Sequence, residues 1–163
     1  MVVLAACGTG RGGASSPPSE SGPEHGLVLT RTTGHYLMVM DILAPERMYT
    51  HDEMASLRPA DGEVVVRGHP GVIDTATTDT RHVEVHVYGI DDGKPVVDAH
   101  PVMTMTDHTG GHTYDVDATL MHDIVIGEPD SHYGTNTRLP AGHAFTLHVQ
   151  VGDESTDFDG VLP

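Results

Sequence analysis

The sequence of 163 residues is strongly acidic, with 24 aspartate and glutamate residues against 8 lysine and arginine residues and a formal net charge of −16 at pH 7. It lacks the excess of basic residues by which proteins bind nucleic acid, so nucleic acid is not an expected partner. The single cysteine, Cys7, excludes an intrachain disulfide. The 13 histidines point further toward function, because imidazole titrates near neutral pH and is a common metal ligand.

The N-terminus resembles the end of a bacterial lipoprotein signal. The run Leu4-Ala5-Ala6-Cys7 has the apolar residue, the two small residues and the cysteine of a lipobox. Residues 8–26 are rich in Gly, Ser and Pro, a composition that forms flexible tethers. We therefore expect a lipoprotein signal remnant and tether over residues 1–26, with lipid on Cys7, and a globular domain over residues 27–163. This order predicts a cell-envelope protein, periplasmic or anchored to the outer face of the cytoplasmic membrane.

The globular part alternates short apolar runs with Gly- and Pro-containing turns. A capping box at Thr50 and Glu53 predicts one short helix ending near Leu57. Strands are expected at residues 27–32, 35–43, 63–67, 81–88, 95–106, within 112–126, at 143–151 and at 156–162, with a hairpin turn at 91–93. Seven or eight short strands separated in this way predict an all-β fold, an immunoglobulin-like antiparallel β-sandwich with one short helix and a disordered N-terminal tether.

The run from Arg81 to Tyr88 alternates strictly between valines and polar residues. Such a pattern predicts a strand that buries its valines in the core. On the other face, His82 and Glu84 lie close enough to approach one metal ion, with His86 beyond them. Alternatively, these polar residues form the solvated face of a half-buried strand.

A second segment, His132-Tyr133-Gly134-Thr135-Asn136, leads to an apolar residue, Gly142 and an alternating strand. This pattern, with His82-x-Glu84 and Leu43-x-Pro45-x-x-Met48, is similar to the bacterial periplasmic iron-transport accessory family over about residues 35–151. In that family the His-Tyr-Gly segment supplies a copper-binding histidine, and an earlier His-x-Glu pair and a methionine supply further ligands.

The resemblance implies a metal site formed by His82, Glu84, Met121 and His132. Met121 is about four residues further from His132 than the family pattern implies. The loop between Met48 and His82 is also long, and a late His-rich loop has no counterpart after Val151. The fourth ligand is therefore open between Met121 and three alternatives, His122, His86 and Met48.

Three residues of the His-Tyr-Gly-x-Asn segment have expected supporting roles. We expect Tyr133 and Asn136 to fix the loop that presents His132, and Gly134 to adopt a positive φ. An imidazole must be neutral to ligate, so metal binding should weaken below a pH of about 6.5.

The mixture of thioether, imidazole and carboxylate points to copper, with iron as the alternative. We expect a lipid-anchored metal-binding accessory of iron or copper uptake rather than an enzyme. Its partners would be the metal ion, the membrane through Cys7, and an iron permease or a second copy of the chain. A copper-resistance carrier of the same fold is the nearest alternative. The alternative from another class is an immunoglobulin-like protein-interaction module without a specific metal site.

Overall fold

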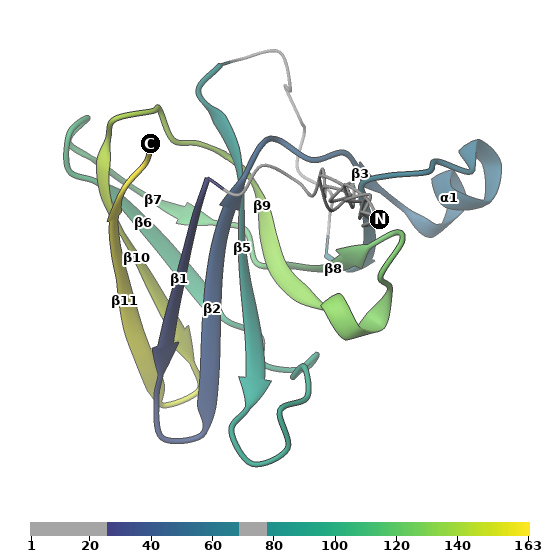
Figure 1. The fold of residues 1–163 in the computed structure, drawn as a ribbon, viewed down its shortest axis with the longest axis horizontal. Helices are drawn as coiled ribbons and strands as arrows, with labels where there is room; N and C mark the ends of the chain where they lie inside the picture. The colour runs from purple at the N-terminus through teal and green to yellow at the C-terminus, as the bar shows by residue number, and fades with distance from the viewer. Residues whose placement is uncertain (1–25, 69–77) are drawn as a thin grey trace, which may run out of the picture.

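The computed structural model of the protein describes residues 26–68 and 78–163. The predicted lipid attachment at Cys7 and residues 8–25 of the predicted tether lie outside this part of the chain. The described residues form two β-sheets that pack face to face, with one short α-helix (Figure 1). The predicted β-sandwich is confirmed, while its immunoglobulin-like character stays a prediction.

The larger sheet has seven strands and the smaller sheet has four. In spatial order the larger sheet contains β1 (Leu27–Thr32), β2 (Tyr36–Leu43), β5 (Thr80–Gly89), β9 (His132–Arg138), β8 (Thr119–Asp123), β4 (Glu63–Arg67) and β3 (Met48–Tyr49). The smaller sheet contains β11 (Glu154–Val161), β10 (Ala144–Val151), β6 (Val102–Asp107) and β7 (His112–Val116). The predicted antiparallel pairing holds except between β3 and β4, which are parallel.

The helix α1 (His51–Leu57) lies at the β3 end of the larger sheet, and the 3-10 helix η1 (Glu128–Asp130) lies between β8 and β9. The predicted capping box starts α1. The Thr50 hydroxyl accepts a hydrogen bond from the Glu53 N–H at 3.3 Å, and the Glu53 carboxylate accepts one from the Thr50 N–H at 2.8 Å. Two otherwise unpaired backbone donors at the helix start are thereby satisfied.

Two strand predictions are wrong because the chain changes sheets inside them. The region 95–106 was expected to return from the turn at 91–93 as one strand. Instead, Pro95 forms a single bridge with Tyr88, and β6 begins only at Val102, in the other sheet. The region 112–126 holds two strands, β7 and β8, which belong to different sheets. Alternation of side chains cannot reveal such a crossing, because both strands keep period two.

The core lies between the two sheets, and β5 places its valines in it as predicted. Val83, Val85 and Val87 are at most 1% exposed. Each contributes about 1.5–3 kcal/mol relative to an exposed side chain. Facing them, β10 contributes the predicted apolar row, whose side chains are at most 3% exposed: Phe145, Leu147, Val149 and Val151.

The opposite face of β5, which we call the outer face, is also buried. His82, Glu84 and His86 are 0%, 6% and 8% exposed, so the alternative of a solvated strand face is wrong. The outer face carries its own small apolar cluster, Met48, Val65 and Met121. Polar groups are therefore enclosed on a part of the sheet that the second sheet does not cover.

Candidate metal centre

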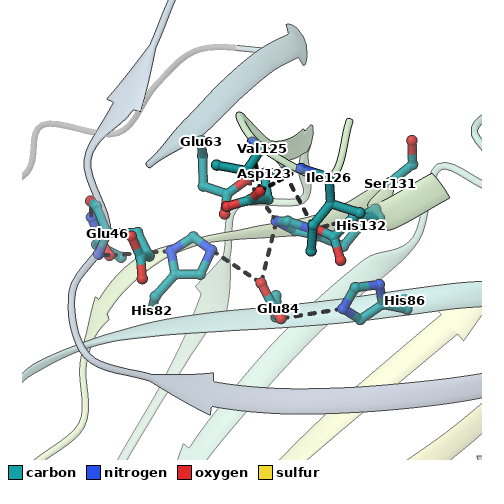
Figure 2. A network of polar contacts seen from close by, with 12 residues as sticks. Glu46, Glu63, His82, Glu84, His86, Asp123, Val125, Ile126, Ser131 and His132 are labelled. Atoms are coloured by element: carbon teal, nitrogen blue, oxygen red, sulfur yellow. Dashed lines mark hydrogen bonds and ion pairs between the residues drawn. The ribbon is translucent and has the colours of Figure 1, made fainter. Parts of the chain in front are cut away.

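Three of the four predicted ligands, His82, Glu84 and His132, come together on the outer face (Figure 2). His82 and Glu84 lie two residues apart on β5 and project from the same side. On the neighbouring strand β9, Asn136 pairs with His82 and Gly134 pairs with Glu84. His132, two residues before Gly134, therefore reaches the same side. The Oε2 atom of Glu84 lies 3.6 Å from Nε2 of His82 and 3.3 Å from Nε2 of His132.

A fourth group, Glu63, contacts His132 of this cluster and was not predicted. Its Oε2 atom lies 3.5 Å from Nε2 of His132, and the residue is only 4% exposed. Glu63 begins β4 and is separated from β9 by β8. The sequence offered a weak signal, because an acidic residue at the start of the apolar run Val64–Val66 reads equally well as a solvated strand end.

The ligand atoms of His82, Glu84 and His132 are close enough together that they could hold one metal ion. Bonds of about 2.0–2.2 Å in a tetrahedral site place neighbouring ligand atoms about 3.3–3.6 Å apart. Oε2 of Glu84 lies 3.3 and 3.6 Å from the two Nε2 atoms, and the ligand atoms of His82, Glu84 and His132 all lie within 4.8 Å of one another. The Nε2 atoms of His82 and His132 and the Oε2 atom of Glu63 are buried without a hydrogen-bond partner among the described residues. Buried polar atoms are costly unless they are paired. This arrangement could hold a metal ion.

The ring of His132 is oriented by Asp130. Its Nδ1 lies 2.8 Å from the Asp130 backbone oxygen and 3.5 Å from the carboxylate Oδ2. Both oxygens can only accept, so Nδ1 carries the proton. In the neutral ring Nε2 is then the free lone pair, and it is the atom directed at Glu84. A carbonyl or carboxylate behind a ligating imidazole is the usual outer support of a metal site.

His82 is oriented in the same way by Asn136. The backbone of Glu46 fixes the amide, since its oxygen accepts from Asn136 Nδ2 at 2.7 Å and its N–H donates to Oδ1 at 3.1 Å. The Oδ1 atom, 3.2 Å from His82 Nδ1, therefore accepts the proton of that nitrogen. Asn136 thus supports His82, and its predicted role in fixing the loop that presents His132 is wrong.

We expect Asn136→Leu to weaken metal binding about 10–100-fold without unfolding the protein. The substitution removes the acceptor that holds His82 Nε2 free, and loss of such outer partners has effects of this size. Calorimetric metal titration measures the change. The matched control is Gln150→Leu, the same loss of an amide at an exposed β10 position whose side chain donates to the Gly152 carbonyl oxygen. Equal affinity in both variants would contradict the role of Asn136.

The supporting role predicted for Tyr133 is also wrong, because its side chain points to the core side of the sheet. The hydroxyl donates to the Val96 carbonyl oxygen at 2.8 Å and accepts from the Ala99 N–H at 3.0 Å. It fastens the segment that crosses between the sheets. Tyr133 belongs to the main apolar core, at 3% exposure.

Gly134 does not adopt the predicted positive φ. It lies inside β9, where an added Cβ would stand 2.3 Å from the Val83 carbonyl oxygen and 2.9 Å from Cα of Glu84. A glycine is required here because two backbones approach closely, which is the other reason for glycine in a strand. This close backbone contact places Glu84 next to β9, the strand that carries His132.

Met121 lies directly opposite His132 in the pairing of β8 with β9. Directly opposed residues of an antiparallel pair share one face of the sheet, so Met121 is on the outer face, where it is fully buried beside Met48. The extra residues between Met121 and His132 form the loop that contains η1 and leave the register intact. Met121 therefore remains a candidate for an additional sulfur ligand.

The three alternatives for the fourth ligand are placed differently. His122 follows Met121 in β8 and so points to the opposite face, which removes it from the site. Met48 packs against Met121. His86 places Nε2 3.2 Å from the second oxygen of Glu84, Oε1, and forms with Asp130 and His132 another group that could hold an ion.

Burial and charge set the protonation of the four groups. Burial raises the pKa of Glu63 to about 8, despite the opposing charge of His132. Burial lowers the pKa of His82 to about 4. Burial also disfavours the charged forms of Glu84 and His132, but other contacts outweigh it. The hydrogen bond with Asp130 and the charges of Glu84 and Glu63 raise the pKa of His132 to about 9. The hydrogen bond with His86 and the neighbouring imidazoles lower the pKa of Glu84.

At pH 7 the metal-free cluster therefore holds two exchangeable protons, one on Glu63 and one on His132. Removing both leaves two carboxylates and two neutral imidazoles. A divalent cation among them makes the buried group neutral as a whole, which avoids the large cost of an unpaired charge in the interior.

Comparison of the chain with protein-family models, with curated proteins and with solved structures finds no match. Among the described residues, no helix has the length and apolar character needed to cross a membrane. The buried His and Glu residues, together with the partly buried Asp130, could hold a metal ion. They are the features of the described fold on which an account of its function rests.

Proposed function

We propose that the protein binds one transition-metal ion through Glu63, His82, Glu84 and His132. The observation that carries this proposal is the convergence of the buried ligand atoms of His82, Glu84 and His132 within 4.8 Å of one another, with Nδ1 of both imidazoles hydrogen-bonded so that Nε2 is the atom directed at Glu84. Glu63 joins this group through His132, whose Nε2 lies 3.5 Å from its Oε2. In a cluster that served only to stabilise the fold, the buried Nε2 of His82 would have a hydrogen-bond partner, since buried polar groups in proteins are paired. It has none among the described residues.

Copper is the first candidate ion, with iron as the alternative. Sites of nitrogen and oxygen ligands bind Cu²⁺ most tightly among the divalent first-row ions. A thioether from Met121 would add affinity for Cu⁺. The second carboxylate, Glu63, was absent from the ligand set suggested by the sequence. It makes the set harder and so favours divalent ions, including Fe²⁺, over Cu⁺.

We further propose that the protein is a metal-binding accessory in iron or copper uptake and not an enzyme. The resemblance of His132-Tyr133-Gly134-x-Asn136 and His82-x-Glu84 to the iron-transport accessory family supports this role. So does the lipobox-like run ending at Cys7, which fits an exported and lipid-anchored protein. The ligands are at most 6% exposed, an environment suited to holding and handing on an ion.

The partner that receives the ion would be an iron permease or a second copy of the chain. The ion would leave through the more exposed of the two groups, His86, Asp130 and His132. Asp130 is 24% exposed and the His86 side chain 11%, while the side chains of His82 and His132 are fully buried. Glu84 faces both groups, with Oε2 toward His82 and His132 and Oε1 toward His86. An ion could therefore move from the group that contains His82 to the group that contains His86 and Asp130 while it stays bound to Glu84.

The test is a calorimetric titration of the purified full-length chain with Cu²⁺, Fe²⁺ under anaerobic conditions, and Mg²⁺, followed by elemental analysis. We expect one tight site per chain for copper, weaker binding of iron and no binding of Mg²⁺, which prefers octahedral oxygen sites. Several weak and interchangeable sites would contradict the proposal. Such a result would favour the interaction module whose histidines only adjust surface charge.

A further inference from the structure

A second concave site lies across the larger sheet from the metal centre. Leu120 and His122 on β8 point to the face opposite Met121, and both line a hollow of about 670 Å³. Ligand pockets for small organic molecules have volumes of about 300–1,000 Å³. The hollow therefore has the size of a site for a small organic molecule rather than for an ion.

The hollow combines apolar walls with cations at its rim. Val66 and Val97 line it and are 43% and 44% exposed, so their apolar surface is open to a ligand. Arg67 and Lys94 also line it. Lys94 is the one lysine among 163 residues, in a chain of net charge −16. A mostly apolar pocket with a few convergent polar groups is typical of small-molecule sites.

The polar groups of the lining are largely uncommitted. Among the described residues, the Lys94 side chain has one long ion pair, with Asp92 at 3.8 Å, and it is 78% exposed. Nη1 of Arg67 lies 3.4 Å from Nε2 of His100. The buried Nδ1 of His122 has no hydrogen-bond partner among the described residues. Against these donors the lining contains one carboxylate, Glu128.

We propose that this hollow is a binding site for a small organic anion with an apolar body, such as an aromatic sulfonate or carboxylate. The apolar part would lie on the exposed Val66 and Val97, and the anionic group would lie toward Arg67 and Lys94, which line the same hollow. The proposal does not depend on the proposed metal function, because the hollow shares none of the four proposed ligands; residues 128, 129 and 131 of its lining flank Asp130.

The test uses 8-anilinonaphthalene-1-sulfonate, an apolar anion whose fluorescence rises in apolar sites, with the full-length folded chain. We expect saturable binding of one molecule. Lys94→Glu should weaken it at least ~10-fold, because reversing a charge within about 4–6 Å of a bound anion changes an attraction into a repulsion. Val97→Trp, which fills the hollow, should also abolish binding. Uncharged N-phenyl-1-naphthylamine should bind the wild type more weakly and be insensitive to Lys94→Glu.

The control for charge is Arg31→Glu, the same reversal on β1 at the far edge of the larger sheet. It should leave probe binding unchanged, and all variants should keep the wild-type thermal transition. Equal losses in Lys94→Glu and Arg31→Glu, or unchanged binding in Val97→Trp, would overturn the proposal. Metal titration of Lys94→Glu should match the wild type, so failure here is distinguishable from failure of the metal site.

Discussion

Replacing His132 by alanine should weaken metal binding by more than ~100-fold. Loss of a group that merely supports a ligand costs about 10–100-fold, and His132 contacts both carboxylates of the cluster, Glu84 at 3.3 Å and Glu63 at 3.5 Å. His82→Ala should have a similar effect, because its Nε2 lies 3.6 Å from the same Glu84 oxygen. Calorimetric titration with copper measures both.

The control for these variants is His112→Ala, which removes an exposed histidine of β7 in the other sheet. It should bind copper as the wild type does. All three variants should stay folded, because the main apolar core lies on the other face of β5 and keeps every side chain. Graded, similar losses in the three variants would show that the histidines act as unspecific surface ligands.

The apparent affinity for copper should rise on the order of 10³-fold between pH 6 and pH 8. Both Glu63 and His132 must lose a proton to ligate, and their pKa values in the metal-free protein are raised to about 8 and about 9. Below these values each displaced proton makes binding about tenfold stronger per pH unit. The dependence should flatten above about pH 9. This pH range lies above the pH of about 6.5 below which the sequence predicts weaker metal binding. The difference arises because contacts with Asp130 and the carboxylates retain the proton on His132.

The Glu63→Gln variant tests how much of this pH dependence comes from the proton on Glu63. An amide has no proton to lose, so the slope of log affinity against pH should decrease by about one below pH 8, where the wild type displaces two protons. Proton release on binding, measured in buffers of different ionisation enthalpy, gives the same number directly. An affinity that changes less than ~10-fold over this range, or an unchanged slope in Glu63→Gln, would contradict the raised pKa values.

Much of the fold was predictable where a pattern is local. The valines of β5, the apolar row of β10 and the capping box at Thr50 depend on neighbouring residues in sequence, and all three predictions are confirmed. The change of sheet between β7 and β8 was not predictable, because it depends on which sheet has room for a strand. The parallel pairing of β3 with β4 likewise depends on distant contacts.

The candidate site divides in the same way. His82 and Glu84 could be placed on one face because strand geometry fixes their spacing. Joining them to His132 required the resemblance of the His-Tyr-Gly segment to a known family. Glu63 was missed because its place beside His132 depends on the order of β9, β8 and β4. Asn136 was expected to act near the site, but its partner, His82, follows only from the register of β5 with β9.

The two faces of β5 have a consequence for how this protein can vary over evolution. Alternate residues line the core and the candidate metal centre, so substitutions on one face can accumulate with little effect on the other. A single-residue insertion or deletion within the strand is different, because it moves every later side chain to the opposite face. It would turn the valines toward the ligands and the ligands toward the core. We therefore expect sequences that share this centre to vary in residue type along β5 while keeping its length.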